Sequence, residues 1–321
     1  MIGKVLLLAV ASLCAFSVTA ADTYPTRPIR MVLSNGPGSA GDILGRIAFM
    51  RAAESLGQQI VVDNRTGAGG TIAVEIVARA APDGYTLLAT SFATHSVAPH
   101  TYKSVPYHPI NDFAPISIVS SSPSMMTVHP SVPVHNVKDL LALARSRPGQ
   151  INYASAGAGT NPHIAGELFN ILGKVSLVPV HFKGGGPSLI AAMSGEVSAT
   201  FTNIAETSAF VRANRLRALA VTSPKRSPAF PQVPTVDESG LPGYEFVTWF
   251  AFLAPAKTPR AIIVQLNEQL RKTLATPEQI KLFAERGLDI VASTPEAASD
   301  HLKKEVERWA RVIKERGMRA E

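Results

Sequence analysis

The chain of 321 residues contains one cysteine, Cys14, so no disulfide can form within it. Charged residues are scarce at 17%, while hydrophobic residues make up 46% of the sequence. This balance excludes intrinsic disorder and provides ample material for a packed core. After residue 22 no run of about 18 apolar residues occurs, which excludes a membrane-spanning helix from the rest of the chain.

The start of the chain has the parts of a secretory signal peptide. Lys4 supplies a positive charge, residues 5–18 form an apolar run, and Val18-Thr19-Ala20 places small residues at the usual cleavage spacing. The run is too short for a stable membrane anchor, and lipidation of Cys14 is the weaker alternative because a large residue precedes it. We therefore expect residues 1–21 to be removed and the mature protein, free of cysteine, to reside in the periplasm.

The formal net charge is +7, yet the lysines and arginines are scattered along the chain. They are dense only in residues 303–319, where Glu305, Glu307 and Glu315 alternate with them. Such alternation is typical of a solvated helix face, whereas a nucleic-acid surface gathers charge of one sign. We expect no nucleic-acid partner, and a protein-interaction module that uses this basic helix is one alternative function.

Short apolar runs alternate with amphipathic stretches, a pattern that predicts a parallel sheet covered by helices. The expected strands are residues 29–33, 59–63, 85–90, 124–129, 151–155, 177–182, 197–202, 216–222 and 246–253. The expected helices are residues 42–56, 71–80, 137–146, 162–172, 188–194, 205–213, 259–287 with a break near Pro277, and 295–316. Residues 223–243 contain five prolines and predict a long connection.

Two successive α/β cycles predict two lobes with a ligand cleft between them. We expect residues 22–120 and 245–321 to form lobe 1 and residues 121–244 to form lobe 2. The linking strands are expected near residues 115–125 and 243–254. In open α/β sheets, ligands bind outside the carboxyl ends of the strands, so the loops at those ends are the candidate site.

Four glycine-rich loops each follow a predicted strand and precede a predicted helix. They are residues 36–41, 67–70, 157–160 and 184–187. Glycines let the backbone approach a ligand closely, and helix starts present free N–H groups with positive partial charge. These loops therefore predict recognition of a carboxylate by the backbone, with ordinary tight turns as the alternative interpretation.

A nucleotide-dependent oxidoreductase is the alternative enzyme hypothesis. The loop from Gly36 to Gly41 fits the spacing G-x-G-x-x-G, and Asp63 ends the next predicted strand. Three facts weaken this hypothesis: NAD is a cytoplasmic cofactor, Pro37 removes an N–H from the loop, and a similar loop recurs at residues 157–160. We therefore expect no cofactor.

Other enzyme signatures are missing from the sequence, so we expect no catalysis. The motifs G-x-S-x-G, H-E-x-x-H and G-x-x-x-x-G-K-[ST] do not occur. His163 and Glu167 are one helical turn apart but lack a third metal ligand at helical spacing. This favours a histidine that bonds the loop or a ligand, and no metal site. Trp249-Phe250 is expected in the core or as a pocket wall.

Several segments resemble the receptors of tripartite tricarboxylate transporters, the Bug (TctC-like) family. The matching segments run in order over nearly the whole mature chain: Tyr24 to Arg30, Pro37-Gly38 with Asp42, Val62 to Arg65, Gly67 to Gly70, Ala80 to Leu87, Asp112 to Ile116, Gly157 to Thr160 with His163, Gly166 to Leu168, Lys183-Gly184, Leu216 to Thr222, Val233 to Val236 and Gly240 to Tyr244.

The resemblance implies an α/β periplasmic-binding-protein fold of the type II kind, whose two lobes close on a small organic acid. The loops at residues 35–40 and 157–160 would grip a carboxylate, partly through water, and the receptor would deliver the acid to a membrane permease without catalysis. We expect a monomer. The expected ligand-binding residues are Asn35, Gly38, Ser39, Ala40, Ser91, Gly157, Ala158, Gly159, Thr160, His163 and Asn203.

The sequence departs from the family pattern at two places that concern the ligand. Asn35 and Gly36 stand where the family has an aromatic residue and a proline, which puts the usual water-mediated geometry in question. Thr202 stands where the family strand has an aspartate, which disfavours a ligand with an ammonium group. A plain monocarboxylate or dicarboxylate, aliphatic or aromatic, is the expected ligand.

Overall fold

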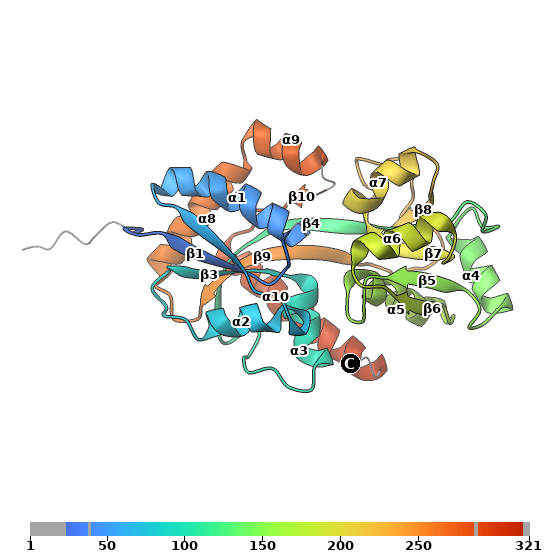
Figure 1. The fold of residues 1–321 in the computed structure, drawn as a ribbon, viewed down its shortest axis with the longest axis horizontal. Helices are drawn as coiled ribbons and strands as arrows, with labels where there is room; N and C mark the ends of the chain where they lie inside the picture. Colours follow the sequence, from blue (N-terminus) through green and yellow to red (C-terminus); the bar gives the residue numbers. More distant parts are fainter. Residues whose placement is uncertain (1–23, 38–39, 286–287, 317–321) are drawn as a thin grey trace, which may run out of the picture.

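The computed structural model describes residues 24–37, 40–285 and 288–316. They form the expected two-lobed α/β fold, with the lobes side by side and long strands running between them (Figure 1). The predicted signal peptide and two predicted site residues, Gly38 and Ser39, lie outside the described ranges. Of the helices within those ranges, none is both long and apolar enough to cross a bilayer.

Strands of both lobes belong to one hydrogen-bonded array in the order β2-β1-β3-β9-β4-β7-β5-β6, and β8 and β10 also pair with β4. The strands are β1 (Ile29–Leu33), β2 (Ile60–Asn64), β3 (Thr86–Ser91), β4 (Phe113–Val128), β5 (Asn152–Ser155), β6 (Val178–His181), β7 (Ala199–Asn203), β8 (Arg217–Val221), β9 (Val247–Pro255) and β10 (Asp289–Ile290). The apolar runs predicted β1 to β9 but missed β10, and the first part of β4 falls where a linking strand was expected, near residues 115–125.

The helices also follow the predicted order. They are α1 (Ala40–Leu56), α2 (Thr71–Ala78), α3 (Ala98–Thr101), α4 (Val137–Ser146), α5 (Asn161–Gly173), α6 (Gly185–Ser194), α7 (Ile204–Arg212), α8 (Arg260–Leu274), α9 (Pro277–Glu285) and α10 (Pro295–Arg316), with the short turns η1 (Ala68–Gly70) and η2 (Ala93–Val97). The sequence predicted all of these except α3, η1 and η2.

The array is parallel at its start, as the alternation of strands and helices predicted, and antiparallel where the two lobes join. β1 is parallel to β2 and β3 in the first lobe, and β5 is parallel to β6 and β7 in the second. β9 is antiparallel to β3 and β4, and β4 is antiparallel to β7 and β8. The reason is that β4 leaves the first lobe and β9 returns to it, so these two strands run in opposite directions.

The core of the first lobe lies on both faces of β1. Ile29, Met31 and Leu33 pack in the cluster that α1 and α8 complete, whereas Val32 packs in the cluster that α2 and α10 complete. Alternate side chains of a strand point to opposite faces of its sheet. Because helices cover both faces, β1 is a continuous apolar run in the sequence.

β4 passes from one lobe to the other and changes partners on the way (Figure 1). Its first part, up to Pro123, pairs with β9, and its last part, from Ser124, pairs with β7. At this change the Thr222 hydroxyl accepts from the Ser124 N–H (2.8 Å) and donates to the Ser124 carbonyl (3.0 Å). This contact ties β4 to the chain that returns towards β9.

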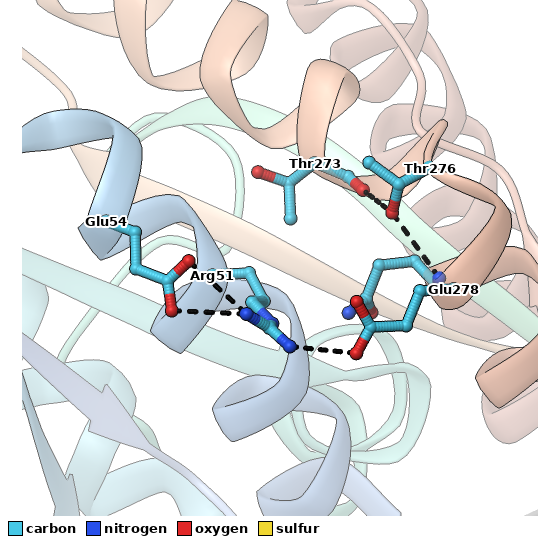
Figure 2. Close-up of polar contacts among 6 residues, drawn as sticks. Arg51, Glu54, Thr273, Thr276 and Glu278 are labelled. Carbon is cyan, nitrogen blue, oxygen red and sulfur yellow. Dashed lines mark hydrogen bonds and ion pairs between the residues drawn. The ribbon is translucent and has the colours of Figure 1, made fainter.

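The predicted break near Pro277 separates α8 from α9. Proline suits the first position of a helix because its missing N–H would have no helical partner there. Near this break the Thr276 hydroxyl donates to the Thr273 carbonyl (3.0 Å), and Arg51 of α1 pairs with Glu278 of α9 (2.8 Å; Figure 2). Both ion-pair partners are exposed, so the pair orients α9 but contributes little stability.

Candidate functional site

A cavity of about 380 Å³ lies between the two lobes, where β1, β3 and β7 end. The starts of α1, α2 and α5 meet at this cavity, and the first N–H groups of a helix lack a partner within the helix. The residues that line it are Ser34, Asn35, Gly36, Gly41, Gly67, Gly69, Gly70, Ser91, Ala93, Thr94, Val97, Ala98, Thr101, Tyr102, Ala158, Gly159, Thr160, Asn161, Asn203, Glu206 and Phe250.

The first loop of the site is held from behind by polar side chains. Asn64, at the end of β2, donates from Nδ2 to the Asn35 carbonyl (2.8 Å) and to Asp42 Oδ1 (3.0 Å). Asp42 is 4% exposed and lies in the first turn of α1, where a negative charge is stabilised by the helix dipole. Any side chain at Gly41 would overlap the Asn35 amide. Asn64 therefore links the two ends of this loop, Asn35 and Asp42.

The second loop requires glycine for its backbone and for its close approach. Gly69 and Gly70 have φ of +65° and +88°, a region that other residues rarely adopt. A methyl group at Gly70 would lie 2.8 Å from the Thr94 hydroxyl and 2.9 Å from the Ser34 carbonyl. The absence of side chains brings the start of α2 against the first loop and opens its backbone to the cavity.

The third loop, residues 157–160, is closed by its own hydrogen bonds. The Thr160 hydroxyl donates to the Gly157 carbonyl (2.7 Å), and the Ser155 hydroxyl donates to the same carbonyl (2.8 Å). The Gly159 N–H donates to Nδ1 of His163 (3.0 Å). Because the Thr160 hydroxyl is engaged in this way, the N–H groups at the start of α5 lack a side-chain cap from it.

His163 bonds the loop, as the sequence favoured over a metal role. Its Nδ1 accepts from Gly159, so the neutral ring carries its proton on Nε2. Burial, together with the nearby His181 ring at 4.9 Å, lowers the pKa of His163 from 6.5 to about 4. Glu167 accepts a hydrogen bond from the Tyr153 hydroxyl (2.9 Å). Within the described ranges, no group of three or more potential metal ligands occurs.

A turn of π-helix after β3 forms a wall that the sequence did not predict. Residues Ala93, Thr94 and Val97 of η2 line the cavity, and Thr101 and Tyr102 continue the wall. Single π turns occur often at functional sites because they redirect side chains. The available signal was the position of the segment, directly after the carboxyl end of a strand.

Charge is sparse in the cavity. Among the described residues that line it there is no lysine, arginine or histidine, and Glu206 is the one carboxylate. Asn161 lines the cavity with a buried Oδ1 that has no hydrogen-bond partner among the described residues. Buried polar atoms are almost always paired, so this oxygen is a candidate acceptor for a hydrogen-bond donor on the ligand.

The structure brings together six of the predicted site residues, Asn35, Ser91, Ala158, Gly159, Thr160 and Asn203. Gly157 of the third loop and His163 of α5 are not among the lining residues, and Ala40 begins α1. The fourth glycine loop, before α6, does not line this cavity in the described part of the chain. Phe250 forms part of the wall and Trp249 is buried, as expected for this pair.

The geometry around Asp63 does not fit a ribose site. Asp63 accepts from Arg30 Nη2 (2.6 Å) and Arg65 Nε (2.9 Å) and is not a lining residue. Burial opposes its ionisation, but the hydrogen bonds from the two guanidinium groups outweigh burial and lower its pKa. The carboxylate that the oxidoreductase hypothesis requires is thus occupied by surface ion pairs.

Three larger hollows lie elsewhere in the described part of the molecule. One of about 1070 Å³ is bordered by α8 and α9, one of about 610 Å³ by α10 and residues 223–228, and one of about 400 Å³ by the starts of α8 and α10. None is lined by a predicted site residue, and their walls mix acids with bases. The cavity between the lobes is therefore the candidate ligand site.

The two lobes and the cavity between them define the class of a solute-binding protein. The chain also matches the model of the tripartite tricarboxylate transporter family receptor over residues 44–318, and it belongs to that family. The members of this family and their structural relatives are transport receptors rather than enzymes, which overturns the oxidoreductase alternative.

Known relatives resemble the chain over most of its length. BugT of Bordetella pertussis is 36% identical, over 92% of this chain and 91% of BugT. The structure of a Rhodopseudomonas palustris protein with adipate has a TM-score of 0.83 and 33% identity, covering 92% of this chain and 99% of that one. MatC from the same species, with bound malate, has a TM-score of 0.80 and 29% identity, covering 90% and 100%.

Proposed function

We propose that the protein captures a small organic carboxylate in the periplasm and delivers it to a membrane permease of the tripartite tricarboxylate type. The observation that carries this proposal is a cavity between two lobes where three helices start and where the described lining residues include no basic side chain. Family membership supports the transport role. The solved relatives with adipate and malate support a carboxylate as the ligand class.

In this proposal the backbone binds the carboxylate. The starts of α1 and α5 belong to different lobes, and a helix start carries amide N–H groups with positive partial charge. A ligand that contacts both loops would favour the closed arrangement of the lobes, because only that arrangement makes both sets of hydrogen bonds. Asn35, Asn161 and Asn203 add neutral polar groups to the wall.

The location and the lobe boundaries are parts of the same proposal. Residues 1–21 would act as a cleaved signal peptide, and lobe 2 would span residues 121–244 between the two segments of lobe 1. The change of β4 partners between Pro123 and Ser124 supports the first boundary. β9, which begins at Val247, supports the second.

A melting screen tests the proposal. The purified protein is unfolded by heat in the presence of a panel of millimolar monocarboxylates and dicarboxylates, aliphatic and aromatic. A ligand at one hundred times its Kd should stabilise the protein by about 2.7 kcal/mol. No shift in melting temperature with any acid would contradict the proposal.

A matched pair of variants tests whether the ligand binds in the cavity. Asn161→Leu keeps a similar volume but removes the buried amide from the wall, and we expect it to lose most of the shift. Asn111→Leu changes an exposed asparagine outside the cavity and should keep the shift. Equal shifts in the two variants would argue for another site.

A further inference from the structure

Glu206 is an unexpected residue in a site for anions. It lies in the first turn of α7, its side chain is exposed, and it lines the cavity on the side of the second lobe. Among the described lining residues, no lysine, arginine or histidine is present to neutralise it. A ligand that enters this cavity therefore meets a negative charge as well as helix starts.

The surroundings of Glu206 set its place within the cavity. A methyl group at Gly185 would lie 3.3 Å from Glu206 Oε2, so the carboxylate lies against the start of α6. Its own position in α7 is also a helix start, where a negative charge is stabilised. Glu206 therefore lies at the starts of α6 and α7, whereas the starts of α1, α2 and α5 contribute no carboxylate to the described residues that line the cavity.

This arrangement gives the cavity two unlike regions. A carboxylate on the ligand is favoured beside α1, α2 and α5, where amide N–H groups converge. A second carboxylate near Glu206 would face a like charge within surroundings that screen charge less than water does. The Glu206 side chain is exposed to solvent in part, and desolvation by neighbouring protein atoms raises the pKa of its carboxyl.

We propose that Glu206 determines specificity: the site takes an organic acid whose other end carries a hydrogen-bond donor, such as an ammonium, amide or hydroxyl group, in preference to a dicarboxylate. The inference rests on the proposed function and narrows its ligand class. A donor at this end forms a charge-assisted hydrogen bond with Glu206. The related structures hold adipate and malate, so this chain would differ from them in preference.

The inference reverses the expectation that Thr202, which stands where the family has an aspartate, disfavours a ligand with an ammonium group. The Thr202 side chain is 3% exposed, and its hydroxyl bonds that of Thr200 (2.7 Å) rather than lining the cavity. Glu206, in the first turn of the following helix α7, does line it. The acid missing from the strand is therefore supplied by the following helix.

Length-matched acids test the inference. Calorimetry is performed with succinate, 4-aminobutyrate and butyrate, and with adipate, 6-aminohexanoate and hexanoate, on the full mature chain. We expect the amino acid of a series to bind about tenfold or more tightly than the dicarboxylate of equal length. Glu206→Gln removes the charge at nearly constant size and should reverse this order. Glu196→Gln removes an exposed acid of the same lobe outside the cavity and should preserve it.

Three results would overturn the inference. The first is a dicarboxylate that binds at least as tightly as its amino counterpart, with a ratio that Glu206→Gln leaves unchanged. The second is an equal change in Glu196→Gln, which would indicate a general effect of net charge. The third is absence of binding by all six acids. The proposed function falls only if the wider panel of acids also fails to bind, so the two failures are distinguishable.

Discussion

His163 should make the stability of the second lobe depend on pH. In the folded protein its pKa is lowered from 6.5 to about 4, first by burial and then by the nearby His181. The unfolded chain therefore takes up a proton on this ring at a higher pH than the folded chain does. As the pH falls from about 6.5 to about 4, the free energy of unfolding should decrease, by up to about 3 kcal/mol from this residue.

Protonation of His163 has a structural consequence at the cavity. A protonated His163 carries a hydrogen on Nδ1, so this atom no longer accepts the hydrogen bond from Gly159. The third loop would lose its contact with α5 at the same pH at which the protein loses stability. Ligand binding should weaken in parallel, because Gly159 lines the cavity.

Urea denaturation at pH steps from 4 to 8 tests this reasoning. His163→Asn places an amide oxygen near the position of Nδ1, so it keeps an acceptor that does not titrate in this range. Burial also lowers the pKa of His95 to about 4, so the wild-type profile contains both residues and the difference from the variant isolates His163. His135→Asn changes an exposed histidine and serves as the control. Parallel profiles for the wild type and His163→Asn would refute the reasoning.

Two further substitutions probe the packing that supports the site. Gly166→Ala would force a methyl group into the Tyr153 ring, and we expect the free energy of unfolding in urea to fall by about 1–3 kcal/mol. Gly186→Ala has open space around its new methyl group and should be neutral or slightly stabilising. Equal losses in the two variants would contradict the packing argument. Thr222→Val leaves the buried Ser124 N–H without its hydroxyl acceptor, and we expect a loss of about 1–3 kcal/mol, whereas unchanged stability would show that the crossing of the lobes does not depend on this bond.

Local patterns in the sequence predicted most elements correctly. β1 (Ile29–Leu33) and α4 (Val137–Ser146) begin and end where the sequence patterns placed them. The short apolar run of β1 and the amphipathic stretch of α4, which follows an Asn cap, are both local signals. β10 was missed because it has two residues and forms only by pairing with β4. The π turn at Ala93–Val97 was missed because no period of apolar residues marks it.

The sequence predicted part of the candidate site as well. The first and third loops were found because glycine between a strand and a helix is visible in the sequence. Thr94, Asn161 and Glu206 were not among the predicted residues, since their presence at the cavity depends on how the lobes face each other. The mixed sheet was also missed, because the direction of β9 depends on its return from the second lobe.

The sequence by itself determined the class of fold, the order of its elements and the glycine loops that open helix starts to a ligand, because these features depend on the residues of each short segment. Only the tertiary structure decided which loops share a cavity, that His163 supports a loop from behind, and that Glu206 faces the same space. These relations join residues that are far apart in the chain, so they arise only when β4 and β9 bring the two lobes together.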